Sequence, residues 1–186
     1  MTRIRVIEPS DATERLAEIY SEISQSRGKI AEVHKIQSLR PESIVAHMKL
    51  YLELMYSKSE LSRAEREMIG TVVSVANGCT YCTKHHAEAL NHYWKANAKV
   101  QDLIRGNYSE ILSEKEKRIC EFSTHLTQHP EQHESADFVH NLRDAGLSDP
   151  AILDVVLVTA YFNFVNRVVL SLGVALEPDN GAGYNY

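Results

Sequence analysis

Apolar side chains recur at intervals of three and four residues along most of the chain, and runs that alternate apolar and polar residues are nearly absent. The first spacing gathers side chains on one face of a helix, whereas alternation would be typical of a strand. The sequence therefore predicts an all-α fold built from several amphipathic helices.

Two helices are predicted in the N-terminal third. The first begins at Ser10 or Asp11 and ends at Gly28, because glycine tolerates the left-handed backbone that follows a helix. Its apolar face comprises Leu16, Ile19, Tyr20 and Ile23. The second begins at Pro41, since proline is favoured in a first turn. Its apolar face comprises Ile44, Met48, Tyr51, Leu52 and Met55.

A helical hairpin is predicted next. Ser62 and Glu65 have the spacing of a capping box, so a helix begins there and continues to the Asn77-Gly78 pair, which is suited to end it. The segment Cys79-Thr80-Tyr81-Cys82 follows at once. The C-x-x-C pair is therefore expected in the first turn of the next helix.

Three more helices are predicted in the C-terminal half. Ser113 and Glu116 form a second capping box, and the helix that they start should end before Pro130. A short helix is expected from Ser135 to Ala145, and a long one from Ser148 to about Leu172. The tail from Glu177 to Tyr186 is rich in Gly and Asn and is expected to be irregular.

The length of 186 residues fits one domain covering residues 1–186. A shift of 86 residues lays 147–172 over part of 61–95, which suggests a degenerate internal repeat, although two apolar helices can resemble each other by chance. Val165 and Val168 then fall where Cys79 and Cys82 stand, so one redox site per chain is expected.

The charge and hydropathy of the chain exclude some classes of binding partner. The formal net charge is −5, and the 20 basic residues are scattered, so no cluster predicts nucleic-acid binding. The N-terminus lacks the apolar stretch of a secretory signal, and no uncharged apolar run approaches the roughly 18 residues of a membrane span. We expect a cytoplasmic protein that does not bind membranes.

The C-x-x-C pair points to redox or metal chemistry, because three cysteines cannot form a disulfide framework. On a helix, Cys79, Cys82 and His86 share one face. The first turn of a helix lowers the pKa of a nearby thiol, and His86 lies one turn after Cys82, where it can accept a proton. Cys82 is thus the expected nucleophile toward a peroxide, and Cys79 the thiol that resolves the resulting sulfenic acid.

Glu67 is the expected third member of this site. In an antiparallel hairpin it lies 10 residues before Asn77, while His86 lies 8 residues after Gly78. The two are then nearly level, offset by about 3 Å along the helix axis, so Glu67 can orient His86 or accept its proton. Glu67 also shares a stripe with Thr71 and Ser74, a pattern equally typical of a solvated helix face.

Other interpretations of these residues stay open. The pair together with His85, His86 and His92 could hold a structural zinc, or could be inert, although ligands on one continuous helix surround a metal poorly. His85, three residues after Cys82, is the reserve candidate for the base. Cys120 reads as a small buried hydrophobe.

Another set of histidines lies at intervals of four residues, at His125, His129 and His133. Pro130 interrupts the helix that they would need, so we do not expect them to bind a metal.

Glu67, the Asn77-Gly78-Cys79-x-x-Cys82 segment and His86 resemble the signature of the alkylhydroperoxidase D family, within the carboxymuconolactone decarboxylase superfamily. The segments 38–41 and 161–168 are similar to its peroxidase-related branch. The resemblance implies a compact multi-helix fold, a homo-oligomer, and reduction of a small hydroperoxide that needs a thiol or disulfide reductant but no cofactor or metal. It also implies Cys82 as peroxidatic residue, Cys79 as its partner, and His86 with Glu67 as proton relay.

The chain departs from the family signature at one place, which limits what the resemblance implies. The best-characterised peroxidases of the family have a histidine between the cysteines, where this chain has Thr80-Tyr81. The full rate and the physiological reductant therefore do not carry over from those peroxidases. The peroxide preference and the number of subunits depend on surfaces that the sequence does not show. A non-redox lactone decarboxylase, a general disulfide oxidoreductase and an assembly protein remain alternatives.

Overall fold

The computed structural model describes residues 2–178, which are mostly helical and contain no strand. In chain order the α-helices are α1 (Glu14–Arg27), α2 (Glu32–Lys35), α3 (Pro41–Tyr56), α4 (Arg63–Ala76), α5 (Thr80–Trp94), α6 (Asn97–Ile104), α7 (Glu114–Gln128), α8 (Val139–Asp144) and α9 (Asp149–Leu172). Short 3₁₀ turns lie at Pro9–Asp11 and Pro130–Glu134. The predicted all-α class is confirmed.

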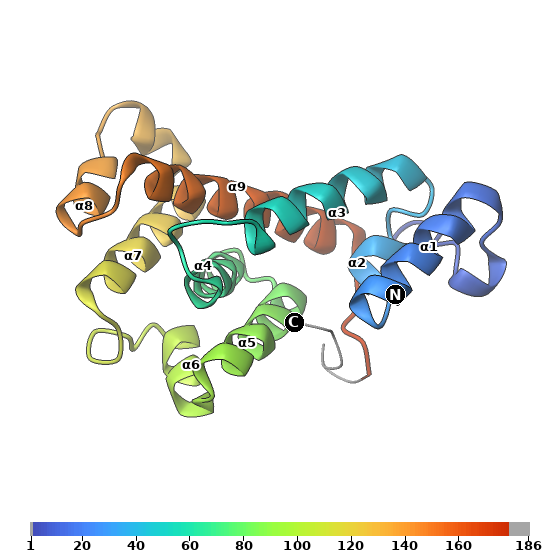
Figure 1. Ribbon diagram of the computed structural model, residues 1–186, viewed down its shortest axis with the longest axis horizontal. Helices are drawn as coiled ribbons and strands as arrows, with labels where there is room; N and C mark the ends of the chain where they lie inside the picture. Colours follow the sequence, from blue (N-terminus) through green and yellow to red (C-terminus); the bar gives the residue numbers. More distant parts are fainter. Residues whose placement is uncertain (1, 179–186) are drawn as a thin grey trace.

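Helix α4 is the centre of the fold. Figure 1 shows it end-on, with α9 above it, α5 below it and α7 to its left. Its most extensive contact is with α5, followed by those with α7 and α9. The hairpin of α4 and α5, which carries the C-x-x-C pair, is therefore packed against α7 and α9.

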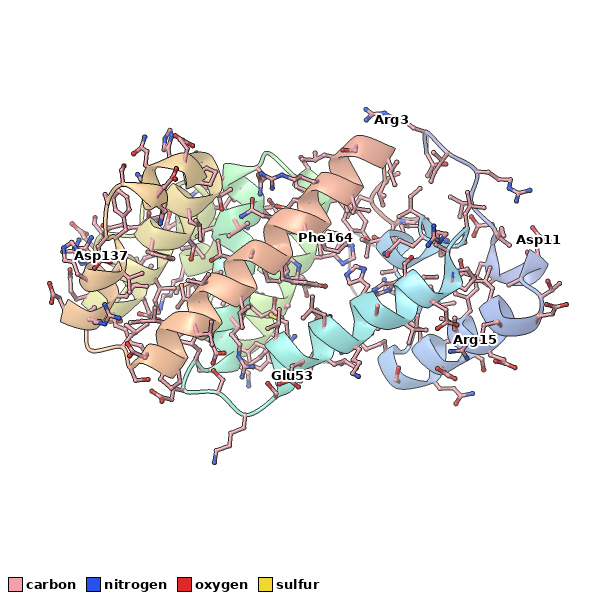
Figure 2. The ribbon with its side chains drawn as sticks, turned by 90° about the horizontal axis from the view of Figure 1, so that it is seen from above. Arg3, Asp11, Arg15, Glu53, Asp137 and Phe164 are labelled. Carbon is pink, nitrogen blue, oxygen red and sulfur yellow. A yellow bond between two sulfur atoms is a disulfide. The ribbon has the colours of Figure 1, made fainter. Side chains whose placement is uncertain are left out.

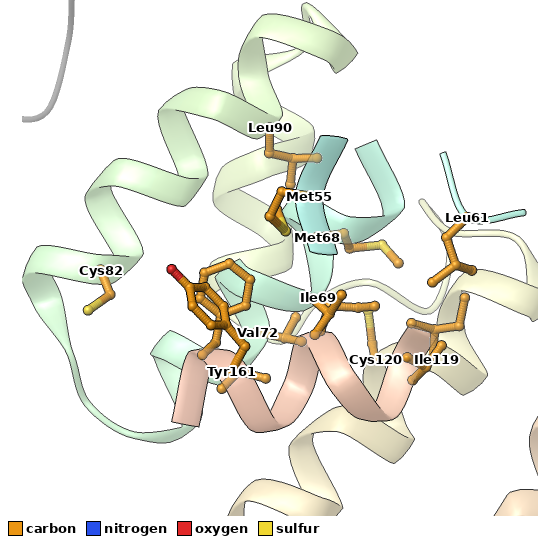
Figure 3. Close-up of a cluster of buried hydrophobic side chains, with 14 of the residues drawn as sticks. Met55, Leu61, Met68, Ile69, Val72, Cys82, Leu90, Ile119, Cys120 and Tyr161 are labelled. Atoms are coloured by element: carbon orange, nitrogen blue, oxygen red, sulfur yellow. The ribbon is translucent and has the colours of Figure 1, made fainter. Parts of the chain in front are cut away.

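The core has two parts. The larger cluster joins α4, α5, α7 and α9 and includes Met68, Ile69, Leu90, Ile119 and Phe162, all of them almost inaccessible to solvent (Figure 3). The smaller cluster packs α1 against α3. The four apolar residues predicted on the first helix are all buried, and on α3 the prediction is wrong for Leu52, which is 43% exposed.

Most predicted helix ends are confirmed by their cap geometry. Both capping boxes, at Ser62 and Ser113, are formed with both of their hydrogen bonds. Gly28 ends α1 in the left-handed region, with φ of 84°. Such caps satisfy amide and carbonyl groups that a helix end leaves free, which is why a local sequence pattern predicts them well.

Two predicted boundaries are wrong. The chain forms a 3₁₀ turn at Pro9–Asp11 and is then extended at Ala12 and Thr13, so α1 begins at Glu14 rather than at residue 10 or 11. Helix α8 begins at Val139 instead of Ser135, because the carboxylate of Asp137 accepts the amide hydrogens of Val139 and His140 and so fixes the start.

Two short helices, α2 and α6, were not predicted, and each is too short to show a helical repeat. Residues 179–186, most of the predicted irregular tail, lie outside the described residues.

Helix α9 crosses one face of the molecule (Figure 2). Among residues 2–178 it alone is long and apolar enough to span a membrane, by length and composition only. It packs against α4, α7 and α3. Its outer side carries exposed apolar residues, namely Leu153, Leu157, Phe164 and Leu170.

Candidate active site

The turn between α4 and α5 delivers the two cysteines. Cys79 is the N-cap of α5, and its Sγ accepts the amide hydrogen of Cys82 at 3.4 Å. The two residues form a disulfide in the structure, with their Cα atoms 5.4 Å apart. Both sulfurs thus lie at the positive end of the helix dipole, which stabilises a thiolate once the bond is reduced.

A buried polar network holds this turn in place. The side-chain amide of Asn77 donates to Asn163 and Asn166 of α9, both at 3.0 Å, and Asn166 donates to Ser74 of α4 at 3.3 Å. The amide of Cys79 in turn donates to the carbonyl of Ser74 at 2.9 Å. The position of the first cysteine is therefore fixed by α4 and α9 together.

The structure brings Glu67 and His86 into direct contact. Nδ1 of His86 lies 2.8 Å from Oε2 of Glu67. Because an ionised carboxylate only accepts hydrogen bonds, Nδ1 carries the proton, and Nε2 is left as the basic nitrogen of the ring. The level placement expected from counting along the hairpin is observed.

Glu67 is charged although it is completely buried. Burial raises its pKa, but the hydrogen bond and charge of His86, and then those of Arg63, outweigh burial and lower the pKa below its ordinary value. Nε and Nη2 of Arg63 donate to Oε1 at 3.0 and 2.5 Å. Arg63 is itself held over the ring of Tyr56, 3.6 Å from its centroid, and donates to Tyr51. The carboxylate thus has a cation on one side and an imidazole on the other.

The interpretation of Glu67, Thr71 and Ser74 as a solvated face is wrong, since all three are inaccessible. The hydroxyls of Thr71 and Ser74 are satisfied by donating to helix carbonyls one turn back.

Gly70 allows α4, α5 and α9 to meet at this point. A Cβ at position 70 would lie 2.8 Å from the ring of Phe162 and 3.2 Å from Cγ of His86. The rings of His86 and Phe162 are in edge contact, with centroids 4.3 Å apart. Because Gly70 has no side chain, the ring of Phe162 can pack against the ring of His86 and fix its position.

His85 forms a second histidine–carboxylate pair. Its Nε2 lies 2.8 Å from Oε2 of Glu177, which belongs to the segment after α9. Oε1 of Glu177 accepts hydrogen bonds from the hydroxyl of Tyr81 and the amide of Glu32. Burial raises the pKa of Glu177, but the hydrogen bond and charge of His85 outweigh it and lower the pKa to about 2. The carboxylate therefore joins the C-terminal segment to α5 and α2.

A cavity of about 90 Å³ lies beside Cys82. His85, His86 and Glu67 line it together with Cys82, while Cys79 does not appear among its described walls. Cys82 and Cys79 are 2% and 0% exposed, so the cavity is the route to the second cysteine.

The cavity wall also contains neutral polar groups that the sequence did not reveal, in addition to the cations Arg27 and Lys29. His34, His47 and Tyr161 lie there. Burial lowers the pKa of His34 to about 3 and that of His47 to about 4. Burial also raises the pKa of Tyr161 well above its ordinary value. All three are uncharged at neutral pH.

These residues come from α2, α3 and α9, so no local spacing links them. Arg63 also escaped notice, although it stands four residues before Glu67 on one helix face and could have been found by that spacing.

The alternative metal sites find no support in residues 2–178, where no three His, Cys, Asp or Glu side chains form a group that could hold an ion. Cys120 is completely buried, as predicted. Burial, and then the charges of Glu116 and Glu121, raise the pKa of its thiol, so it is not a nucleophile at neutral pH.

Comparison with known proteins identifies a family that part of the chain resembles. Residues 41–121 match the carboxymuconolactone decarboxylase family and include Glu67, both cysteines of the pair and His86. An uncharacterized protein of Bacillus subtilis (strain 168), YdfG, is 27% identical over 128 residues, which cover 68% of this chain and 86% of that protein.

The fold is shared with solved structures. The alkylhydroperoxidase AhpD core of an uncharacterized peroxidase-related protein from Ralstonia eutropha JMP134 matches with a TM-score of 0.85 at 23% identity, covering 97% of this chain and 94% of that one. The debrominase Bmp8 matches with a TM-score of 0.79 at 19% identity, covering 97% and 95%. The chain therefore has the fold of the alkylhydroperoxidase AhpD core, and its residues 41–121 match the carboxymuconolactone decarboxylase family.

Proposed function

We propose that the protein is a thiol-dependent peroxidase that reduces small organic hydroperoxides with the dithiol of Cys79 and Cys82. The observation that carries this proposal is the placement of Cys82 at the cavity beside His86, whose far nitrogen is held by the buried carboxylate of Glu67. A nucleophile, a base and a group that orients the base are the parts that such a reaction needs.

The reaction begins from the reduced dithiol. Nε2 of His86 accepts the thiol proton of Cys82, and Glu67 stabilises the imidazolium that forms. The thiolate attacks the terminal oxygen of ROOH, an S–O bond forms as the O–O bond breaks, and the alkoxide RO⁻ takes the proton from His86. The products of this step are ROH and a sulfenic acid on Cys82.

In the second step the sulfenic acid condenses with the thiol of Cys79, and no further oxidant is needed. Cys79 loses its proton, its thiolate attacks the sulfur of the sulfenic acid, and the departing hydroxide takes up that proton to form water as the disulfide of Cys79 and Cys82 forms. An external thiol or disulfide reductant must then return the pair to the dithiol. We propose that this reductant is small, because the sulfurs are nearly inaccessible.

The comparisons support enzyme function in the superfamily more firmly than this particular reaction. The AhpD core of R. eutropha comes from a peroxidase-related protein, whereas Bmp8 is a debrominase with the same fold. Reductive dehalogenation is accordingly the second candidate, favoured by the aromatic rings of Tyr51, Tyr161 and Phe162 in the cavity wall. General exchange with protein disulfides is disfavoured because a second protein cannot reach Cys82 through so small a cavity.

Stopped-flow reaction of the reduced protein with tert-butyl hydroperoxide tests the proposal. We expect wild type to lose two thiols per turnover, Cys79→Ser to lose one, and Cys82→Ser to react at least about 1000-fold more slowly. Wild type whose thiols persist in excess hydroperoxide would refute the peroxidase. Loss of thiols on addition of 2,3,4-tribromopyrrole, which a variant of the debrominase Bmp8 binds, would instead establish the second candidate.

A further inference from the structure

A chain of hydrogen bonds lies across the cavity from Cys82. Nε2 of the Gln37 side chain donates to the carbonyl of Val33 at 2.8 Å and lies 2.8 Å from Nδ1 of His47. Nε2 of His47 lies 2.7 Å from the hydroxyl of Tyr161. His47 and Tyr161 are each only 6% exposed, and both line the cavity.

The direction of this chain follows from its first member. Because the Gln37 atom near His47 also contacts a carbonyl oxygen, it is the amide nitrogen, which can only donate. Nδ1 of His47 must then accept, and since the low pKa of His47, about 4, keeps the ring neutral, its single hydrogen is on Nε2. His47 therefore donates to the oxygen of Tyr161.

The consequence is a hydroxyl hydrogen without an acceptor in the described part of the chain. The oxygen of Tyr161 accepts from His47, so its own hydrogen is directed elsewhere, and the cavity borders the residue. Figure 3 shows the hydroxyl at the end of the ring that faces the helix of Cys82.

A second polar atom is available on the same wall. Nδ1 of His34 is buried and has no hydrogen-bonding partner within residues 2–178. Buried polar atoms are rarely left unpaired, and a bound molecule can supply the missing partner.

We propose that Tyr161 is a catalytic residue that donates a hydrogen bond to the inner oxygen of the bound hydroperoxide, the oxygen that leaves as alkoxide. This inference rests on the proposed peroxidase function and adds a donor that the C-x-x-C helix does not contain. Gln37 and His47 act through Tyr161 and are positioning residues.

The role of Tyr161 is to stabilise charge, and the proton balance is unchanged. As the thiolate of Cys82 takes the terminal oxygen, the electron pair of the O–O bond moves to the inner oxygen, where negative charge develops. A donor fixed before the reaction stabilises that charge without reorganisation. The proton that converts the alkoxide to the alcohol is the one that His86 took from Cys82.

The cavity also defines a substrate class. Its volume of about 90 Å³ is small. Arg27 and Lys29 line it as well as the neutral groups of His34, His47 and Tyr161. We therefore expect compact alkyl hydroperoxides, in which the leaving alkoxide is strongly basic and the hydrogen bond from Tyr161 matters most.

The test compares two oxidants with different leaving groups in single-turnover oxidation of the reduced protein. For Tyr161→Phe we expect the rate constant with tert-butyl hydroperoxide to fall about 100-fold. With peracetic acid, whose leaving acetate is a weak base and needs little stabilisation, the fall should be below about threefold. His47→Phe should show the same selectivity with a smaller loss, and it provides the answer if Tyr161→Phe does not fold.

Tyr20→Phe is the matched control, because Tyr20 is also buried but bonds to the carbonyl of Ile7 in the separate N-terminal cluster. It should leave both rate constants unchanged. Equal slowing of both oxidants by Tyr161→Phe, or no slowing of either, would overturn the role of Tyr161 while wild type still outpaces Cys82→Ser. If wild type and Cys82→Ser are equally unreactive, the proposed function fails and this inference fails with it.

Discussion

Two adjacent histidines on α5 make the same contact with two very different carboxylates. His86 meets Glu67 of the central helix α4, and His85 meets Glu177 of the C-terminal segment, each at 2.8 Å. Glu67 is inaccessible and forms an ion pair with Arg63, whereas the Glu177 side chain is 9% exposed and is hydrogen-bonded to residues of two helices, α2 and α5. The two pairs have the same contact distance and differ in the burial and the neighbours of their carboxylates.

The difference indicates different tasks. The pair of Glu67 and His86 lies within one rigid hairpin, where a charge fixed in a water-poor site can act on the chemistry. The pair of Glu177 and His85 joins the end of the chain to α2 and α5, so it stabilises the wall of the cavity. We assign proton transfer to the first pair and structural support to the second.

Among the changes that distinguish the two histidine–carboxylate pairs, Glu67→Gln should have the largest effect on rate and stability. Its amide cannot stabilise the imidazolium of His86 and leaves Arg63 without its counter-charge. We expect the rate constant for hydroperoxide to fall about 100-fold and the free energy of unfolding to fall by about 3 kcal/mol. Stopped-flow kinetics and urea unfolding measure the two quantities.

Glu177→Gln is the matched comparison for this change, and it should lower the rate constant by less than about threefold. Equal losses of rate in the two variants would contradict the division of tasks.

Gly70→Ala should disturb the first pair alone. In an open helix this change would add about 1 kcal/mol of stability, but the added Cβ would meet the packed ring of Phe162 at 2.8 Å. We expect a net loss of about 1 to 3 kcal/mol in the free energy of unfolding, together with slower hydroperoxide reduction as His86 is displaced. A variant more stable than wild type would show that α9 can move aside and that this packing does not fix His86.

The pair of Glu177 and His85 should make the free energy of unfolding depend on pH in the acid range. The pKa of Glu177 is about 2 in the folded protein, below its ordinary value of 4.5, so the folded state favours the charged form. The stabilisation is present above about pH 4.5 and is lost as the pH falls toward about 2. Because the group is partly solvated, we expect about 1 kcal/mol or less at neutral pH.

Urea unfolding of wild type and Glu177→Gln from pH 7 to pH 2 measures this contribution. The stability difference between the two proteins should vanish at the acid end. A difference that stays constant over this range would mean that charge on Glu177 is not its cause.

The smallest effect is expected at the third cysteine, which serves as a control for thiol chemistry outside both pairs. Cys120→Ala removes a buried sulfur whose thiol is kept protonated by burial. We expect a loss of about 1 kcal/mol in stability and a rate constant within about twofold of wild type. Thiol titration of the reduced native protein should count two reactive groups in wild type and in the variant, and a third group in wild type would contradict this account.

The helices that the sequence predicted well are those whose ends are encoded locally. Ser62 and Ser113 cap their helices through side chains three residues away, and the Asn77-Gly78 pair ends α4. Helices α2 and α6 escaped because four and eight residues do not show a periodic pattern. The start of α8 escaped because the carboxylate of Asp137, which precedes the N-cap Phe138, accepts the first amide hydrogens of the helix.

The residues of the site also fall into those that local spacing predicts and those that it does not. Cys79, Cys82 and His86 share a helix face, and Glu67 could be reached by counting across one turn, so four residues of the site followed from spacing. His47, Tyr161 and Glu177 come from segments that only the tertiary fold brings to the cavity. The burial of Glu67 was also hidden, because a stripe of Glu, Thr and Ser looks polar until the packing of α4 is known.

The central claim is that Cys82 is the sulfur that meets the hydroperoxide, and trapping the sulfenic acid tests it most directly. Reduced Cys79→Ser and Cys82→Ser proteins are each treated with one equivalent of tert-butyl hydroperoxide in the presence of dimedone, and the labelled residue is located by mass spectrometry. The account predicts a dimedone adduct on Cys82 in the Cys79→Ser protein and none on Cys79 in the Cys82→Ser protein. An adduct on Cys79, or none in either protein, would contradict it.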